Sequence, residues 1–465
     1  MGLAQQHASC TDIEGGRTYH LRVTRPAPIR SVTTIMLAIA AVGAVLVVCW
    51  HIWVVPFTDP VYGLFNMGID TRVYRGGAIA VWDGLPLYAK PVYEVWEFTY
   101  PPFAALVMVP LAGLPIHTAK FLWNVGSVIS LLLLIGLSLR ALRFRFDARF
   151  VAFTVLVAVF ATSLEPVHTT LWNGQINLVL ALFVVADLAL RNHRLQGLGV
   201  GLAAGIKLTP LFFVAHLVTV RKFRAAIVAV AVFVGTVLIG IAVLGREAID
   251  FWTGDISDTK RIGSMAAPAN QSFNGFFARL GTMDLAHPPT WLWVPVGLVV
   301  GLLSLWAAYC AYQAGGRLLA VAITGMASCA VSPFSWGHHW VWILPLLLVA
   351  FVHAYEQTRR EDPRTWLWWL APASIVTLTF TYWQAMPLPV PGHPGKVFHG
   401  MAFGSFRGFG SVDGPAWQVP FQLIGSGAYL IVLLGTIAVT LWWTRRVEPI
   451  RSAQRLVESD DALPS

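Results

Sequence analysis

The sequence predicts an all-α protein that crosses a membrane many times. Of its 465 residues, 56% are hydrophobic and only 12% are charged, which is about half of the charged share that is typical of soluble domains. Uncharged runs such as 32–55 and 419–443 exceed the roughly 18 residues that suggest a transmembrane helix. We therefore expect one helical membrane domain, 32–443, between an N-terminal tail, 1–31, and a C-terminal tail, 444–465.

The apolar runs divide this domain into about ten spans and two shorter elements. Spans are expected near 32–55, 118–140, 150–167, 175–190, 225–244, 291–313, 315–332, 339–355, 366–386 and 419–443. Residues 101–115 are too short to cross and are bracketed by prolines, whereas 197–220 are interrupted by Lys207 and Pro210. No cleavage site follows the first basic residues, so 32–55 is expected to act as an uncleaved signal anchor.

The basic residues favour one orientation of these spans. The 32 Lys and Arg residues give a net charge of +9, and their gathering in short loops indicates topology and not a nucleic-acid partner. If 101–115 lies at the outer surface and 197–220 dips in and returns, most basic loops face the cytoplasm. These loops are Arg140–Arg149, Arg191–Arg194, Arg221–Arg224, Arg359–Arg364 and Arg445–Arg455. Both termini are then cytoplasmic, and the outer face of the plasma membrane carries 56–117, 165–174, 245–290, 333–338 and 387–418.

One carboxylate, Asp70, stands beside Arg72 and Arg75 in the segment FNMGIDTRVYRGGAIAVWDGLPLY, directly after the first span. Asp70 or Thr71 could cap a helix that begins near Arg72. The following residues, 72–83, have the loose amphipathic pattern of a helix that lies at the membrane surface. The other interpretation is that Asp70 performs chemistry at the outer face.

Polar residues also gather where two spans meet, in SLEPVHTTLWNGQINL. They are Glu165, His168, Asn173, Gln175 and Asn177, which could form a sugar-binding mouth or an ordinary interfacial loop. Lys207, in GIKLTP, lies at membrane depth, where a charge is costly and indicates a functional site. Its ammonium could face a lipid phosphate, or the side chain could extend to the cytoplasmic surface.

Two further clusters lie in the later outer segments. NQSFNGFFARL contains Asn270, Gln271 and Arg279, which could bind hydroxyl groups and phosphate. SPFSWGHHWVW contains His338 and His339 at the start of a span, where Trp and His are also common as interfacial residues. No P-loop, dinucleotide fingerprint, H-E-x-x-H or D-x-D motif occurs, and neither the histidines nor the four cysteines have metal-ligand spacing. The sequence therefore calls for no cofactor and no metal, and it disfavours a nucleotide-sugar donor.

The order of several short motifs resembles the polytopic glycosyltransferases of family 87, which have the GT-C fold. The motifs are GIDTRVYRGGAIAVWDGLPLY, FTYPPFAAL, NGQINLVL, GIKLTPL, NQSFNG and SPFSWGHHW, spread over roughly residues 60–350. The chain looks like the mycobacterial α-mannosyltransferases that use polyprenol-phosphate-mannose. The resemblance implies inverting transfer of mannose from that donor to a phosphatidylinositol mannoside, forming an α-(1→2) bond at the outer face. Its expected partners are the two lipid substrates and membrane lipids.

The resemblance also implies roles for the polar residues. Asp70 matches the acidic position of the first outer loop and is expected to act as the general base. Polyprenyl phosphate leaves as an anion, so no general acid is required, but cations or donors must hold it. The candidates for donor phosphate binding are Arg72, Lys207, Arg279, His338 and His339. The candidates for substrate binding are Arg75, Glu165, His168, Asn173, Gln175, Asn270 and Gln271.

Two alternatives stay open at this point. An α-(1→2) branching mannosyltransferase of lipomannan and lipoarabinomannan would use the same donor and form the same bond. A transporter or flippase for a lipid-linked sugar belongs to a different class, in which internal repeats and broken helices at the membrane midplane are common. The sequence shows no convincing repeat, and its polar residues gather in the outer segments, which favours an enzyme.

Overall fold

The computed structural model confirms the all-α architecture. It describes residues 29–53, 56–57, 63–190, 194–258, 261–267, 269–282, 286–359, 363–380, 388–389, 397–398 and 424–445. The predicted tails, 1–31 and 444–465, and the predicted outer segment 387–418 lie almost entirely outside the described residues. Within the described part, the regular elements are helices apart from one short antiparallel pair, β1 (Leu388–Pro389) with β2 (Val397–Phe398).

The helices follow the apolar runs of the sequence. The first half contains α1 (Thr34–Trp53), α2 (Ile69–Trp82), α3 (Pro102–Met108), η1 (Val109–Leu111), α4 (Ile116–Ala141), α5 (Ala148–Ala161), α6 (Glu165–Asn173), α7 (Asn177–Leu188), α8 (Leu198–Ile206), η2 (Thr209–Leu211) and α9 (Phe212–Thr219). The second half contains α10 (Phe223–Leu244), α11 (Arg246–Thr253), η3 (Asp255–Ser257), α12 (Phe273–Thr282), α13 (Trp293–Gln313), α14 (Arg317–Ala330), η5 (Gly337–Trp340), α15 (Ile343–Thr358), η6 (Thr365–Trp369), α16 (Leu370–Thr379) and α18 (Ala428–Thr444). Among the described residues, α1, α4, α10 and α13 are long and apolar enough to cross a membrane, and shorter apolar helices accompany them.

The span expected at 150–167 ends earlier than predicted, because α5 stops at Ala161 and the last residues of the range belong to α6. The hydroxyl of Thr162 donates to the carbonyl of Val159 (2.8 Å), and that of Ser163 donates to the carbonyl of Phe160 (2.7 Å), at the end of α5. Pro166 lies in the first turn of α6, where its missing N–H is tolerated but where a continuous helix would be broken. The chain therefore turns before Glu165, and α6 becomes a short separate helix.

Residues 197–220 form a re-entrant hairpin, as the sequence predicts. α8 ends where Lys207 adopts an extended conformation (φ −149°, ψ 128°), and η2 and α9 lead the chain back. The ammonium of Lys222 donates to the side-chain oxygen of Gln196 (2.9 Å), so the two ends of the hairpin meet. α8 packs closely on α10 because it presents glycines there: a Cβ at Gly201 would lie 2.6 Å from the carbonyl oxygen of Ala229.

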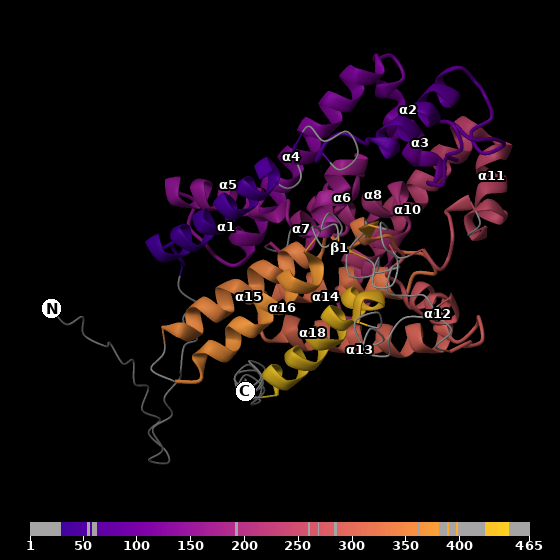
Figure 1. Ribbon diagram of the computed structural model, residues 1–465. Coiled ribbons are helices and arrows are strands. Elements are labelled where there is room, and N and C mark those ends of the chain that lie inside the picture. The colour runs from indigo at the N-terminus through magenta and orange to yellow at the C-terminus, as the bar shows by residue number, and fades with distance from the viewer. Residues whose placement is uncertain are drawn as a thin grey trace, which may run out of the picture.

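The two ends of the helix bundle differ in charge. At one end, here named the basic end, Arg30 pairs with Glu356 (Nη2 to Oε2, 3.0 Å). Lys222 and Arg317 approach the ring of Tyr312 to 5.4 and 5.8 Å at the same end, since the neighbouring helices α14 and α15 run in opposite directions. The opposite end carries the short helices α2, α3, α6, α11 and α12; Figure 1 shows α2, α3 and α11 gathered at the upper right.

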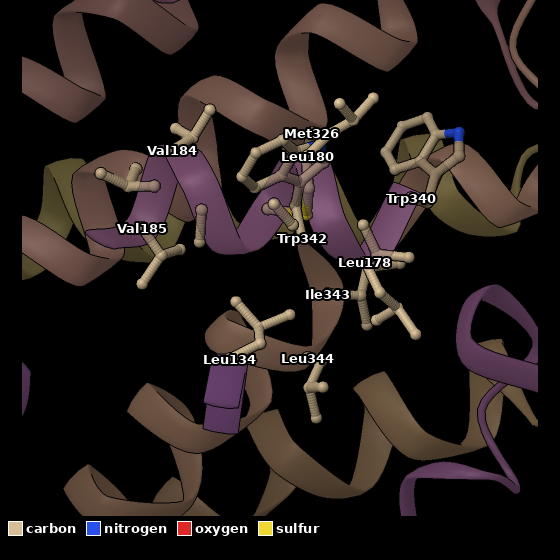
Figure 2. Packing of buried hydrophobic residues seen from close by; sticks show 14 of the residues in the cluster. Leu134, Leu178, Leu180, Val184, Val185, Met326, Trp340, Trp342, Ile343 and Leu344 are labelled. Atoms are coloured by element: carbon tan, nitrogen blue, oxygen red, sulfur yellow. The ribbon is translucent and has the colours of Figure 1, made fainter. Parts of the chain in front are cut away.

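A buried apolar core joins these ends. Figure 2 shows Leu180, Val184 and Val185 of α7 beside Met326 of α14, and Leu134 of α4 nearby. The segment from η5 into α15 completes this core with Trp340, Trp342, Ile343 and Leu344. All of these side chains are buried, so the core fixes the start of α7 and the position of η5, which carry several of the candidate site residues.

Candidate functional site

Helix α2 begins without a side-chain cap. Its N-cap residue is Gly68, in the left-handed conformation (φ +61°, ψ 30°), and Asp70 lies inside the first turn. The hydroxyl of Thr71 is directed to the carbonyl oxygen of Gly174, at 3.5 Å. The expectation that Asp70 or Thr71 caps this helix is therefore wrong, and the Asp70 carboxylate is available for other interactions.

Asp70 belongs to a polar cluster drawn from four parts of the chain. The cluster, here named the Asp70 cluster, comprises Asp70, Tyr74, Tyr100, Gln175, Asn177 and Lys207. The amide side chain of Gln175 hydrogen-bonds the Asp70 carboxylate. The hydroxyls of Tyr74 and Tyr100 lie 3.1 Å from Gln175 Oε1 and 3.1 Å from each other. Gln175 therefore connects the carboxylate to two aromatic hydroxyl groups.

Lys207 completes the cluster from the tip of the re-entrant hairpin. Its ammonium donates to Asn177 Oδ1 (2.9 Å) and lies 5.5 Å from the centre of the Tyr100 ring, a favourable position for a cation. The positive charge also acts on the carboxylate of Asp70. The alternative that Lys207 extends to the cytoplasmic surface is therefore wrong, because its ammonium points into the cluster.

The surroundings of Asp70 set its acidity. Burial raises the pKa of this carboxyl from 3.8 to about 6, while the hydrogen bond from Gln175 and the charge of Lys207 oppose the rise. The group is thus mostly ionised at neutral pH but still basic enough to accept a proton. A pKa near the working pH is what a general base requires.

Two of the predicted phosphate-binding residues are near enough to Lys207 to interact with its positive charge. Both His338 and His339, in η5, are close enough for its charge to act on their imidazoles. The backbone carbonyl of His339 accepts a hydrogen bond from Cys329 at the end of α14 (3.3 Å). The Lys207 ammonium therefore interacts electrostatically with the Asp70 carboxylate and with the imidazoles of both histidines.

The predicted residues of α6 occupy a different set of contacts. Buried Glu165 accepts hydrogen bonds from Tyr429 at the start of α18 and from Thr169 (3.0 Å). His168 is also buried, and its ring stacks on that of His51 with centroids 6.2 Å apart. Asn173 is the last residue of α6 and is partly buried. α6 thus links α18 and α1 to Gln175, which follows it.

The cluster around Asn270 joins the segment before η5 to α12 and to Ser426, which lies just before α18. Asn270 is buried, and its Oδ1 accepts from the backbone N–H of Ser335 (3.0 Å). Gln271 is buried as well, and its backbone N–H donates to the carbonyl of Ser335 (2.8 Å). Arg279 donates to the hydroxyl of Ser426 (2.8 Å) and to the carbonyl of Asn270 (2.6 Å). These contacts connect protein groups to one another in this part of the structure.

Arg72 and Arg75 lie on another face of α2 than Asp70. Residues three or four apart share a helix face, so Asp70 goes with Tyr74, and Arg72 goes with Arg75. Arg75 donates to the carbonyl of Leu114 (2.8 Å), and the Arg72 guanidinium lies 5.4 Å from the Tyr93 ring centre. The structure therefore separates both arginines from Lys207.

Arg261 connects the segment that contains Tyr88 and Glu97 to the segment after α11. This nearly buried side chain hydrogen-bonds Glu97, lies 3.4 Å from Asp255 and donates to the carbonyl of Tyr88 (3.0 Å). Glu97 directly precedes the short stretch that carries Tyr100 into the Asp70 cluster. These contacts of Arg261 therefore fix the segment that delivers Tyr100.

The sequence interpretation missed two tyrosines of the Asp70 cluster, Tyr74 and Tyr100, and also Tyr429, which hydrogen-bonds Glu165. Tyrosine is common at membrane interfaces, so its presence in a polytopic sequence carries little information about function. The signal that could have found Tyr100 is its position in FTYPPFAAL, one of the motifs of the resemblance. Among the described residues, no three His, Cys, Asp or Glu side chains come together as metal ligands.

Comparison with known proteins places these residues in a family context. Residues 98–333 match the family model of glycosyltransferase family 87, a range that begins after Asp70. A polyprenol-phosphate-mannose-dependent α-(1-2)-phosphatidylinositol pentamannoside mannosyltransferase of Mycolicibacterium smegmatis is 34% identical over 288 residues, which are 60% of this chain and 68% of the relative.

Two proteins of Mycobacterium tuberculosis are similarly related. A phosphatidylinositol mannoside mannosyltransferase of the same donor and linkage from strain H37Rv is 35% identical over 298 residues, 60% of this chain and 69% of the relative. The pentamannoside enzyme of strain CDC 1551 is 32% identical over 333 residues, 70% of this chain and 74% of the relative. No solved structure matches the chain significantly.

Proposed function

Because the chain belongs to glycosyltransferase family 87, we propose that it transfers mannose from polyprenol-phosphate-mannose to a phosphatidylinositol mannoside, forming an α-(1→2) bond. The relatives carry this donor, this linkage and this class of acceptor in their names. Both substrates are membrane lipids, which suits a polytopic enzyme whose polar cluster lies at one end of its helices.

The observation that carries the mechanism is the Asp70 carboxylate in its cluster. The carboxylate takes the proton of the acceptor hydroxyl as the oxygen attacks C1 of the donor mannose. The bond from C1 to the phosphate oxygen breaks, and polyprenyl phosphate leaves as an anion. Attack opposite the leaving group converts the β-linked donor into an α-linked product. Gln175 holds the carboxylate, and a positioned base of this kind typically contributes on the order of 10²–10⁴ in rate.

Lys207 stabilises the negative charge that develops on the leaving phosphate in the same step. Its ammonium is fixed by Asn177 (2.9 Å) and lies where a leaving phosphate can be stabilised as its negative charge develops. The imidazoles of His338 and His339 are near enough to share this task. The same ammonium keeps Asp70 ionised, so one cation serves both the base and the leaving group.

We place the site on the outer face of the plasma membrane and both termini in the cytoplasm. The support is that Arg30, Lys222 and Arg317 gather at the end of the bundle opposite to Asp70, and positive loops favour the cytoplasm. Cysteines introduced at exposed Asp83 and at exposed Arg145 test this orientation. An impermeant thiol reagent should label the first in intact cells and the second only after permeabilisation; the reverse result refutes it.

Asp70→Asn tests the enzyme activity. Membranes with this variant, given labelled polyprenol-phosphate-mannose, should lose mannolipid product by about 10²-fold or more at equal protein level. Asp83→Asn is the matched control, since Asp83 ends the same helix but is exposed. Near-normal product from Asp70→Asn contradicts the general-base role.

The two alternative functions give different results. In detergent micelles that hold both lipids there are no two sides, so a flippase forms no product, whereas a transferase does. Mass spectrometry of glycolipids in cells without the gene identifies the acceptor. Accumulation of an under-mannosylated phosphatidylinositol mannoside supports the proposal, and unbranched lipomannan in its place supports the branching enzyme.

A further inference from the structure

A pair of cations lies beside the start of α2, on the side away from Lys207. Lys120, in the first turns of α4, packs over Gly68, where a Cβ would lie 2.8 Å from Lys120 Cε. Its ammonium hydrogen-bonds the backbone carbonyl of Asn66. Arg72 follows one turn after Gly68, and its charge acts on Lys120. The two positive charges therefore lie close enough to interact at the N-terminus of α2.

This pair has no carboxylate partner among the described residues. Neither Arg72 nor Lys120 takes part in any of the ion pairs there. Glu94 and Arg72 both hydrogen-bond the hydroxyl of Tyr93, so this carboxylate lies near Arg72 but forms no ion pair with it. Asp70 is engaged by Gln175 and Lys207. Two like charges that lie close together repel each other, and an anion bound between them lowers this cost.

The surface next to Lys120 shows what kind of anion fits. Along the following turns of α4, the side chains of Phe121, Leu122, Val125 and Ile129 are exposed. They belong to a helix long and apolar enough to cross the membrane, so they face lipid chains. An anion that suits both features carries a phosphate group at one end and a long apolar chain at the other.

We propose that Arg72 and Lys120 bind the phosphate of a polyprenyl phosphate lipid whose isoprenoid chain lies along the exposed face of α4. The proposal rests on the proposed function, which requires such a lipid at Asp70, two residues from Arg72. Arg and Lys are the usual protein ligands of phosphate. The phosphate of a phosphatidylinositol mannoside fits this place less well, because inositol and mannose residues separate it from the hydroxyl that must reach Asp70.

The pair and Lys207 then have separate tasks. Arg72 and Lys120 receive the donor as it arrives from the membrane and hold the lipid product before it leaves. Lys207 acts on the phosphate while the bond to mannose breaks. Loss of the pair should therefore raise the KM for the donor and weaken inhibition by the product lipid, while kcat and the KM for the acceptor stay unchanged.

Substitutions at Lys120 test this division. Lys120→Met keeps the apolar stem over Gly68 and removes the charge, and about a tenfold or larger rise in donor KM is expected. Lys120→Glu can pair with Arg72, so it should raise the apparent Tm and yet raise donor KM further. Lys120→Arg should restore nearly normal KM. Lys90→Met is the matched control, because it removes a charge from an exposed position of the first outer segment.

Farnesyl phosphate, farnesol and inorganic phosphate serve as probes of the site. Farnesyl phosphate should inhibit the wild-type enzyme competitively with the donor, and about tenfold less strongly in Lys120→Met, whereas farnesol and inorganic phosphate should inhibit weakly. An unchanged donor KM in both Lys120→Met and Lys120→Glu refutes the lipid site. A rise in acceptor KM alone assigns the pair to the acceptor phosphate and also refutes it. Absence of mannolipid product from the wild-type enzyme with both lipids would instead refute the proposed function, so the two failures are distinguishable.

Discussion

Asp70→Asn should stabilise the folded protein at neutral pH while it removes activity. Burial raises the pKa of this carboxyl from 3.8 to about 6, so ionising it is harder in the folded protein than in the unfolded chain. Each pH unit corresponds to about 1.4 kcal/mol, which makes this cost about 3 kcal/mol. Asparagine has the same shape and no charge, so the variant escapes the cost.

The pH dependence of this gain follows from the direction of the pKa shift. Between pH 3.8 and about 6 the folded protein binds more protons at Asp70 than the unfolded chain does, so the stability of the wild type falls as pH rises through this window. Above the window the difference is constant. The stability gained by Asp70→Asn should therefore be largest above about pH 6 and should shrink as the pH is lowered.

The assay is thermal unfolding of the purified protein in detergent, followed by tryptophan fluorescence at about pH 7.5 and at about pH 5. Asp70→Asn should unfold at a higher apparent Tm than the wild type at the first pH, with a smaller difference at the second. Asp83→Asn, whose side chain is exposed, should change neither value. The reasoning is refuted if Asp70→Asn is no more stable than the wild type, or if its gain is the same at both pH values.

Three further perturbations follow from the site and its supports. Mannosyl transfer should decline below about pH 6 as Asp70 is protonated. Lys207→Met should move this decline to a pH about 1–3 units higher, because the positive charge that favours ionised Asp70 is lost. An unchanged pH–rate profile would show that the charge of Lys207 does not affect the pKa of Asp70. Gly201→Ala should cost about 1–3 kcal/mol of stability and raise donor KM, since the added Cβ pushes α8 from α10, whereas Gly235→Ala, which has open space, should be neutral in the same Tm measurement. Arg261→Ala should lower the free energy of unfolding by about 1.5–3 kcal/mol, which is measured as a lower Tm. An unchanged Tm would show that the contacts of Arg261 do not stabilise the protein.

Much of the fold is readable from the sequence because hydrophobic length and helix breakers act locally. The spans at α1 and α10 need only their own composition to be found, and the hairpin is marked by Lys207 and Pro210. The end of the span expected at 150–167 was misplaced because apolar composition continues across the break, whereas the hydroxyl bonds and Pro166 that end α5 are single-residue features. The average composition of a sequence window cannot distinguish a continuous helix from one that such residues interrupt.

The site is only partly readable, for a different physical reason. Asp70, Gln175 and Lys207 stand out because charged or amide groups near a membrane are costly and need an explanation. Tyr100 does not stand out, since its role depends on a contact with Gln175, 75 residues away in the sequence. Arg279 stood out for its charge, yet its bonds to Ser426 and to backbone carbonyls show that a buried cation can serve as a structural connector.

The re-entrant hairpin has a consequence for which parts of the chain can ever meet. Because its two ends, Gln196 and Lys222, meet, α10 starts beside the start of α8 and runs alongside it. Apolar residues at Lys207 and Pro210 would favour one continuous helix, which would carry Lys222 away from Gln196 and the Lys207 ammonium away from Asn177. The break in this one helix thus decides which polar groups reach Asp70.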